Sequence, residues 1–153
     1  ARNASEVGVD ASRLTISGHS AGGHLAAMML ATDWTGYGLP KDLIKGAISL
    51  SGLFDLGPFP HSWLQPALNL TDIEVADNSP LFLPVHTSAK VLIRYGSKEQ
   101  SEFARQSHTY AEYLASQGID VDCKPLKGAD HFTILDPFLL DEAEFVQDIL
   151  NFV

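Results

Sequence analysis

The chain of 153 residues is poor in three kinds of group, and each shortage excludes a class of protein or site. Its single cysteine, Cys123, excludes a disulfide within the chain and a cysteine-rich metal site. Only 10 lysine and arginine residues stand against 19 aspartate and glutamate residues, and the net charge of −9 argues against nucleic acid or an anionic membrane as a partner. No apolar run approaches the roughly 18 residues of a membrane-spanning helix.

What is present is an ordinary globular composition, 45% hydrophobic and 19% charged, without repeats or low-complexity tracts. Short β-rich runs alternate with longer helical stretches, which predicts a mostly parallel sheet with helices on both faces. The expected strands are 14–17, 45–51, 90–95 and 120–126, and the expected helices are 20–31, 101–117 and a terminal helix beginning at Asp136 or Asp141. We therefore expect an α/β protein of one domain, or part of one.

A long segment, residues 57–88, separates the second expected strand from the third. It contains proline, asparagine and aspartate, and it is longer than a plain connection needs to be. We expect a functional loop or a small helical insertion there.

The segment GHSAGG, residues 18–23, follows an expected strand and precedes an expected helix. Its first five residues fit G-x-S-x-G, the nucleophile elbow, in which a strained turn pushes a serine out of the sheet. Ser20 would then be the nucleophile, with Gly18 and Gly22 leaving room that a Cβ would fill. The N–H of Ala21, at the start of the helix, could donate to an oxyanion. The alternative is a tight strand-to-helix turn that glycines pack closely.

A serine nucleophile needs a base, and in this fold the histidine follows an acid in chain order. Six histidines compete for that part. His131 lies in GADHF, a loop directly after the last expected strand, and we take it as the base. His19 is next to the serine and points the wrong way to take its proton. The other four lie in the elbow helix, in the long insertion or within a helix: His24, His61, His86 and His108.

Two carboxylates are candidates for the acid that orients the base. Glu99 follows the third expected strand in GSKEQSEF, where such acids usually lie. Asp55 follows the second expected strand in SGLFDL, which is a less common but workable place. Asp130 is adjacent to His131 and geometrically unsuited to orient it. The position favours Glu99, and Asp55 stays open as the alternative.

Several segments together resemble the kynurenine formamidase (arylformamidase) branch of the α/β-hydrolases, close to the hormone-sensitive-lipase-like esterases. GHSAGG alone is common to many esterases, but its combination with NSPL and an EFxRQS helix start is far more specific. The resemblance runs over essentially the whole chain. It is carried by GVDASRLTISGHSAGGHLA, ISLSGLFDLGPF, NLTDIEVADNSPL, GSKEQSEFARQS and GADHF.

The resemblance implies the α/β-hydrolase fold and a part for three residues. Ser20 matches the family's nucleophile, His131 its base and Glu99 its acid, which is often an aspartate. No metal and no organic cofactor are implied. The family's HGG-type oxyanion loop is not found in the seventeen residues before Gly18. We therefore expect residues 1–153 to be the C-terminal portion of one domain, with the N-terminal half in cis or as a companion chain.

The reaction that the resemblance implies is hydrolysis of N-formyl-L-kynurenine to kynurenine and formate, through a Ser-His-Glu triad and a formyl-enzyme. The substrate is a small molecule, and a cytoplasmic location and a homodimer would both be compatible with it. Phe54, Phe59 and Trp63 in FDLGPFPHSW could line an aryl pocket, with plain core packing as the alternative. Two other functions stay open: a carboxylesterase for small acyl esters on the same triad, and a non-catalytic, truncated hydrolase-like module.

Overall fold

A computed structural model describes residues 3–8, 10–139 and 144–152 of the chain. Four parallel strands form one sheet in the order β1-β2-β3-β4, so each strand pairs with the one before it in the sequence. They are β1 (Thr15–His19), β2 (Gly46–Leu50), β3 (Lys90–Gly96) and β4 (Val121–Leu126). All four lie where the alternating pattern predicts strands, with ends that differ by at most two residues.

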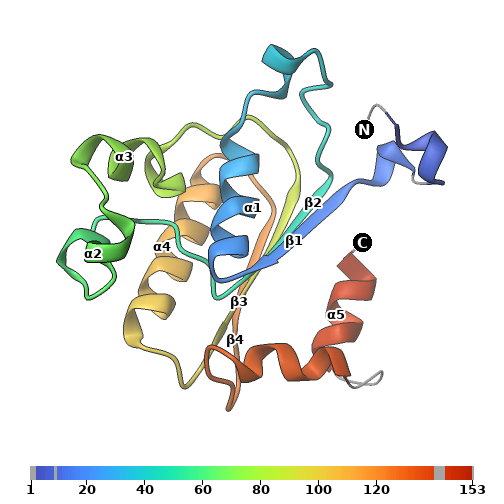
Figure 1. Ribbon diagram of the computed structural model, residues 1–153. Coiled ribbons are helices and arrows are strands. Elements are labelled where there is room, and N and C mark those ends of the chain that lie inside the picture. The colour runs from blue at the N-terminus through green and yellow to red at the C-terminus, as the bar shows by residue number, and fades with distance from the viewer. Residues whose placement is uncertain (1–2, 9, 140–143, 153) are drawn as a thin grey trace.

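Helices cover both faces of the sheet, as the pattern predicts (Figure 1). On one face lie α1 (Ala21–Ala31) and α4 (Ser101–Ser116), and on the other η6 (Thr133–Leu139) and α5 (Glu144–Phe152). Successive residues of β3 serve the two cores in turn: Val91 and Ile93 pack under α1 and α4, and Leu92 packs with Phe145 of α5. Because both faces of this strand are buried, it is a continuous apolar run in the sequence.

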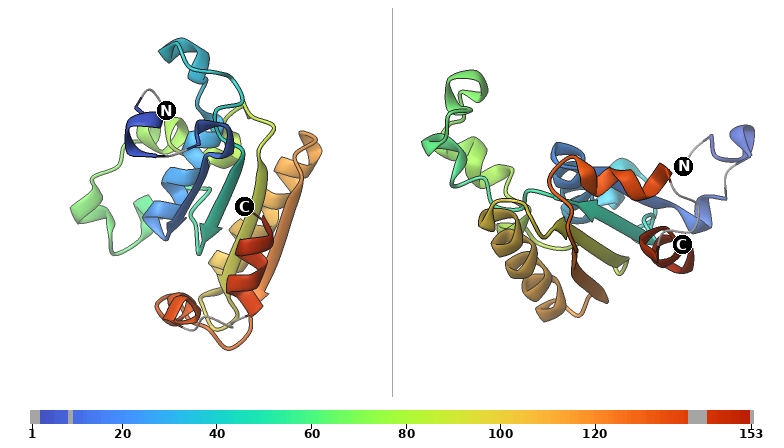
Figure 2. Two further views of the ribbon diagram at one scale, coloured as in Figure 1. Left: turned by 90° about the vertical axis from the view of Figure 1, so that its right-hand side faces the viewer. Right: turned by 90° about the horizontal axis from the view of Figure 1, so that it is seen from below.

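The segment between β2 and β3 consists of short helical turns. They are η4 (Phe59–His61), α2 (Gln65–Leu68), α3 (Asp72–Asp77) and η5 (Pro80–Phe82). A capping box between Thr71 and Glu74 starts α3. The segment projects from the body of the chain (Figure 2). Three further 3-10 helices are η1 (Ser5–Val7) and η2 (Ala11–Arg13) before β1, and η3 (Trp34–Tyr37) after α1.

The end of the chain differs from the single terminal helix that we expected. Asp136 and Pro137 lie within the 3-10 helix η6, so they do not start the last α-helix. The other predicted start, Asp141, lies outside the described residues. The last helix, α5, runs from Glu144 and presents Phe145 to the sheet.

A buried arginine ties α5 to the sheet. Arg94 of β3 is 1% exposed, and its guanidinium donates to the carboxylates of Asp122 at 2.8 Å and Asp148 at 3.1 Å. It also donates to the carbonyls of Ile93 and Asp122. A buried charge is costly unless it is paired and hydrogen-bonded, and Arg94 is both. Among the helices that the structure describes, none is long and apolar enough to cross a membrane.

Candidate active site

One edge of the sheet gathers the polar residues that the sequence singled out. Because all four strands are parallel, their carboxyl ends meet at the same edge, where α/β proteins bind their ligands. Ser20 follows β1, Ser51 follows β2, Glu99 follows β3 and His131 follows β4.

Ser20 has the backbone of a strained turn. Its φ of 56° and ψ of −118° lie in a region that non-glycine residues rarely adopt. Two backbone hydrogen bonds fix the turn. The Ser20 N–H donates to the Leu50 carbonyl at 2.9 Å, and the Ser20 carbonyl accepts from the backbone N–H of His24 at 3.0 Å. The strand before and the helix after are those that the G-x-S-x-G pattern requires.

The expectation of crowding holds for Gly18 and fails for Gly22. A Cβ on Gly18 would lie 2.1 Å from the carbonyl oxygen of Gly22, so the strand and the helix approach too closely for any side chain there. The expectation for Gly22 itself is wrong, since a Cβ there would meet no described atom within 4 Å beyond its own helix and neighbours. Gly23 is the second crowded position, because a Cβ there would lie 2.7 Å from the Ser49 hydroxyl and 2.9 Å from Gly52 Cα.

The structure joins Ser20, His131 and Glu99 by two hydrogen bonds. His131 Nδ1 lies 2.6 Å from Glu99 Oε1, and His131 Nε2 lies 3.0 Å from Ser20 Oγ. Because an ionised carboxylate only accepts, Nδ1 carries the proton, and Nε2 can accept the hydroxyl proton of Ser20. The Glu99 side chain is 1% exposed, whereas the His131 side chain is 27% exposed and reaches the solvent side.

The second carboxylate oxygen of Glu99 accepts two further hydrogen bonds. Glu99 Oε2 accepts from the Ser51 hydroxyl at 2.9 Å and from the Gly96 N–H at 2.6 Å. Ser51 is fully buried and has a positive φ of 47°, which is unusual for a residue with a side chain. Sequence reasoning did not find Ser51; the signal was a serine immediately after a buried strand, at the same edge as the elbow.

The other two carboxylates that the sequence analysis considered are engaged elsewhere. Asp55 forms an ion pair with Arg105 at 3.1 Å and accepts from the Gly57 N–H at 2.9 Å. Asp130 accepts from the backbone N–H groups of Phe132 and Thr133, and these hydrogen bonds lower the pKa of its carboxyl group. Of the carboxylates considered, Glu99 is therefore the one that the structure brings to His131.

A pocket of about 740 Å³ opens beside Ser20 and His131. Its polar wall includes Lys98, Glu102 and Gln106, and its apolar wall is lined by Leu53, Pro58, Phe59, Trp63, Leu64, Phe103 and Phe132. Two predicted pocket residues, Phe59 and Trp63, are thus on this wall. The sequence did not predict Phe103 and Phe132 as pocket residues. In the structure their ring centroids lie 4.8 and 5.6 Å from that of His131.

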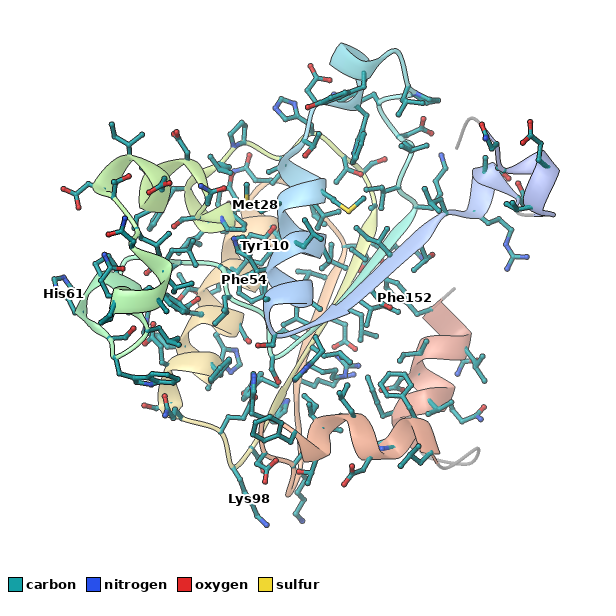
Figure 3. All side chains as sticks on the ribbon, viewed as in Figure 1. Met28, Phe54, His61, Lys98, Tyr110 and Phe152 are labelled. Carbon is teal, nitrogen blue, oxygen red and sulfur yellow. The ribbon has the colours of Figure 1, made fainter. Side chains whose placement is uncertain are left out.

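Phe54, the third residue suggested for the pocket, follows the alternative, which is core packing. Its ring is 0% exposed and stacks on Tyr110 at a centroid distance of 4.3 Å, so it packs in the core instead of facing the pocket. Figure 3 shows the two labelled rings side by side between α1 and α4. In the irregular segment that follows β2, Phe54 packs into the α1–α4 core while its neighbour Leu53 faces the pocket.

A polar clamp fixes the loop that carries part of this wall. Gln106 of α4 is 1% exposed; its carbonyl oxygen accepts from the N–H groups of Phe54 and Asp55, and its amide donates to the Asp55 carbonyl and to Glu102. Arg105 completes the clamp by pairing with both Asp55 and Glu102, and its hydrogen bond lowers the pKa of Glu102. The clamp joins residues of SGLFDL to residues of EFARQS, two segments that carry the family resemblance.

Two further features of the site are the backbone N–H of Ala21 and the lack of a metal-binding cluster among the described residues. Ala21 is the exposed first residue of α1, and the first N–H groups of a helix have no acceptor within it. These N–H groups carry a partial positive charge, which favours an anion at this end of α1. Within residues 3–8, 10–139 and 144–152 no group of three or more His, Cys, Asp or Glu side chains could hold a metal ion.

Curated proteins named kynurenine formamidase match most of this chain. The one from Danio rerio is 37% identical over 145 residues, which are 91% of this chain and 48% of that protein. The one from Salmo salar is 32% identical over 146 residues, or 92% of this chain and 49% of that protein. The chain thus spans about half the length of the curated relatives that it matches. A scan against protein-family models finds no match.

Solved structures give the fold independently. A protein from Silicibacter sp. TM1040, provisionally assigned as a thioesterase, matches with a TM-score of 0.79 and 26% identity over 97% of this chain and 54% of that one. A carboxylesterase from Lactobacillus plantarum matches with a TM-score of 0.68 and 20% identity over 88% of this chain and 51% of that one. The chain therefore has the α/β-hydrolase fold and is a relative, over nearly all of its own length, of the curated kynurenine formamidases.

Proposed function

We propose that the protein is a serine hydrolase that cleaves N-formyl-L-kynurenine to kynurenine and formate. The observation that carries this proposal is the continuous chain of hydrogen bonds from Ser20 through His131 to Glu99, at the mouth of a pocket with an aromatic wall. The similarity to curated kynurenine formamidases supports the choice of a formamide as substrate.

In the first half of the reaction, Ser20 Oγ attacks the formyl carbon while its proton passes to His131 Nε2. The carbonyl oxygen of the substrate becomes an oxyanion, which the Ala21 N–H stabilises by a hydrogen bond. When the tetrahedral intermediate collapses, the carbon–nitrogen bond breaks and His131 gives its proton to the departing aryl amine. Kynurenine leaves, and the formyl group remains as an ester on Ser20.

In the second half, water attacks the formyl ester and gives its proton to His131 Nε2. The ester bond breaks, the proton returns to Ser20 Oγ, and formic acid leaves and gives up its proton to water as formate. Throughout both halves Glu99 accepts from His131 Nδ1, which keeps the imidazole in one tautomer and stabilises its cation when Nε2 is protonated.

The aromatic wall gives a reason for an aryl leaving group. The rings of Phe59, Trp63, Phe103 and Phe132 lie on the pocket wall, and stacked or edge-to-face aromatic pairs add about 0.5–1.5 kcal/mol beyond the burial of their surface. Trp63 is 86% exposed, so its face is available to an incoming ring.

A fluorophosphonate probe tests whether Ser20 is a nucleophile at all. The protein, with whatever sequence its gene encodes beyond these residues, should gain one covalent phosphonyl group on Ser20, and Ser20→Ala should gain none. Folded wild-type protein that does not react, or reacts as fast as Ser20→Ala, would contradict the proposal and favour a non-catalytic module. Reaction at Ser20 together with hydrolysis of small acyl esters alone would favour a carboxylesterase.

A further inference from the structure

His19 is the residue before the proposed nucleophile, and the reaction described above gives it no part. It is the last residue of β1 and pairs with Leu50 of β2, so its backbone belongs to the rigid sheet. Its side chain is partly buried and lies against the loop that carries His131.

One hydrogen bond defines the orientation of the His19 ring. His19 Nε2 lies 2.7 Å from the backbone carbonyl oxygen of His131. Because a carbonyl oxygen can only accept, His19 Nε2 must carry the proton and donate it. The two rings also contact each other directly, with centroids 4.7 Å apart and planes tilted by 43°.

This bond acts on the residue that most needs a fixed position. His131 must hold Nε2 within reach of Ser20 and Nδ1 within reach of Glu99 at the same time, at 3.0 and 2.6 Å. The neighbouring turn is held at other points, because Asp130 accepts from the Phe132 and Thr133 N–H groups. The bond from His19 fixes the backbone of His131 itself.

The same bond also links the backbones of the two reacting residues. His19 is covalently joined to Ser20 and hydrogen-bonded to the carbonyl of His131, so a shift of the His131 backbone relative to the Ser20 backbone must stretch or break the bond of 2.7 Å. A displacement of about 1 Å in an active site can cost about a hundredfold in rate. The Phe103 ring also contacts the His131 ring, at a centroid distance of 4.8 Å, and supplies packing but no hydrogen bond.

We propose that His19 is a positioning residue, which holds His131 in register with Ser20 by donating its Nε2–H to the His131 carbonyl. This inference rests on the proposed function, since it assigns His19 a part in proton transfer between Ser20 and His131. It predicts that the hydrogen bond matters and that the imidazole as such does not, because any donor at the position of Nε2 can replace it.

The test compares two substitutions in the protein as its gene encodes it. His19→Phe keeps an aromatic ring against His131 and removes the donor, whereas His19→Gln places an amide N–H near the position of Nε2. We expect His19→Phe to lower kcat and the rate of fluorophosphonate reaction about tenfold or more, with KM within about twofold, and His19→Gln to restore both rates to within about threefold of wild type. His86→Phe is the matched control, since His86 precedes β3 at the opposite edge of the sheet.

The possible outcomes separate this proposal from the proposed function. If the wild type reacts with the probe and folded His19→Phe reacts as fast, or if His19→Gln rescues nothing, the positioning role is wrong and the hydrolase stands. If the wild type itself does not react at Ser20, the hydrolase is wrong and the role of His19 falls with it. Should His19→Phe not fold, nitrogen NMR of the wild-type imidazoles decides: an Nε2–H tautomer of neutral His19 supports the bond, and an Nδ1–H tautomer overturns it.

Discussion

The Ser51 hydroxyl donates to Glu99 Oε2 at 2.9 Å, although 48 positions separate the two residues in the sequence. The opposite oxygen of the same carboxylate accepts from His131. Ser51 therefore acts on the base through Glu99, by fixing how the carboxylate is turned. It belongs to the support of the site and not to the reacting groups.

Replacing Ser51 should slow the reaction without weakening substrate binding. Both Ser51→Ala and Ser51→Gly remove the hydroxyl, and a hydrogen bond to a charged group contributes about 1.5–3 kcal/mol. We expect kcat to fall about tenfold in both variants, with KM within about twofold. Only glycine relieves the positive φ of 47°, so thermal unfolding should find Ser51→Gly the more stable of the two. Full activity of either variant would contradict the assigned role.

Glu99 and Asp55 can be compared directly, because the sequence left both open as the acid. In Glu99→Gln the amide can donate to His131 Nδ1, which favours the wrong tautomer, and we expect kcat to fall by about three to four orders of magnitude. Asp55→Asn should keep kcat within about threefold, because Asp55 pairs with Arg105 and not with His131. Steady-state kinetics of the two variants decides the matter. A larger loss of kcat in Asp55→Asn would overturn the assignment of Glu99.

The two alanine variants Gly18→Ala and Gly22→Ala should change the free energy of unfolding differently. A Cβ on Gly18 would meet the Gly22 carbonyl at 2.1 Å, so Gly18→Ala should destabilise the fold by about 3 kcal/mol or more, or prevent folding. Gly22 lies in the first turns of α1 with open space around its Cα, and alanine there should be neutral or stabilising by up to about 1 kcal/mol. Urea denaturation measures both variants. Equal destabilisation would show that the open space beside Gly22 is filled in the whole protein.

The clamp around Gln106 should govern substrate binding more than chemistry. Gln106→Met keeps the volume of the side chain and removes the three hydrogen bonds that hold the loop after β2 to α4, together with the bond to Glu102 within α4. We expect KM for N-formylkynurenine to rise about tenfold, while the rate of Ser20 labelling stays within about threefold. Glu112→Gln, an exposed change on the same helix, is the control. Loss of Ser20 labelling with an unchanged KM would contradict this division of roles.

The thiol of Cys123 should be slow to react in the native protein. Burial raises the pKa of Cys123 to about 11, against about 8.5 for an unperturbed thiol. At pH 8 the native thiolate fraction is then about two orders of magnitude below that of the unfolded chain, and iodoacetamide should react correspondingly more slowly. Since the native state keeps this proton to higher pH than the unfolded state does, stability should fall as pH rises from about 8.5 towards 11, and less so in Cys123→Ser. Equal alkylation rates in native and denatured protein at pH 8 would contradict this.

The fold was predictable from the sequence because its signals are local. The buried strands β2 and β3 are short, mostly apolar runs, and parallel strands place whatever follows them at one edge of the sheet. That rule brings Ser20, Glu99 and His131 together without any knowledge of side-chain directions. The rule fails for Gly22, where a motif position was read as crowded although the crowding falls on its neighbour Gly23.

The contacts that hold the site in place were not predictable from the sequence. They depend on side-chain orientations that the folded loops determine. Ser51 contacts Glu99 because its φ is positive, and nothing in the sequence around Ser51 predicts a positive φ. His19 was set aside because it cannot take the proton of Ser20, yet its ring reaches the backbone of His131. For Phe54 the sequence leaves pocket lining and core packing both open, and the structure places its ring in the core. Each of these contacts joins residues more than 40 positions apart, or depends on one φ angle.

The central claim is that Ser20 transfers a formyl group from an aryl amine to water. The most direct test is kcat/KM for N-formylkynurenine and for p-nitrophenyl acetate, measured side by side on the whole protein and on Ser20→Ala. The account predicts a clear preference for the formamide, release of one formate for each kynurenine, and loss of both products by a factor of about ten thousand or more in the variant. Hydrolysis of the ester alone, or formamide hydrolysis that survives Ser20→Ala, would contradict it.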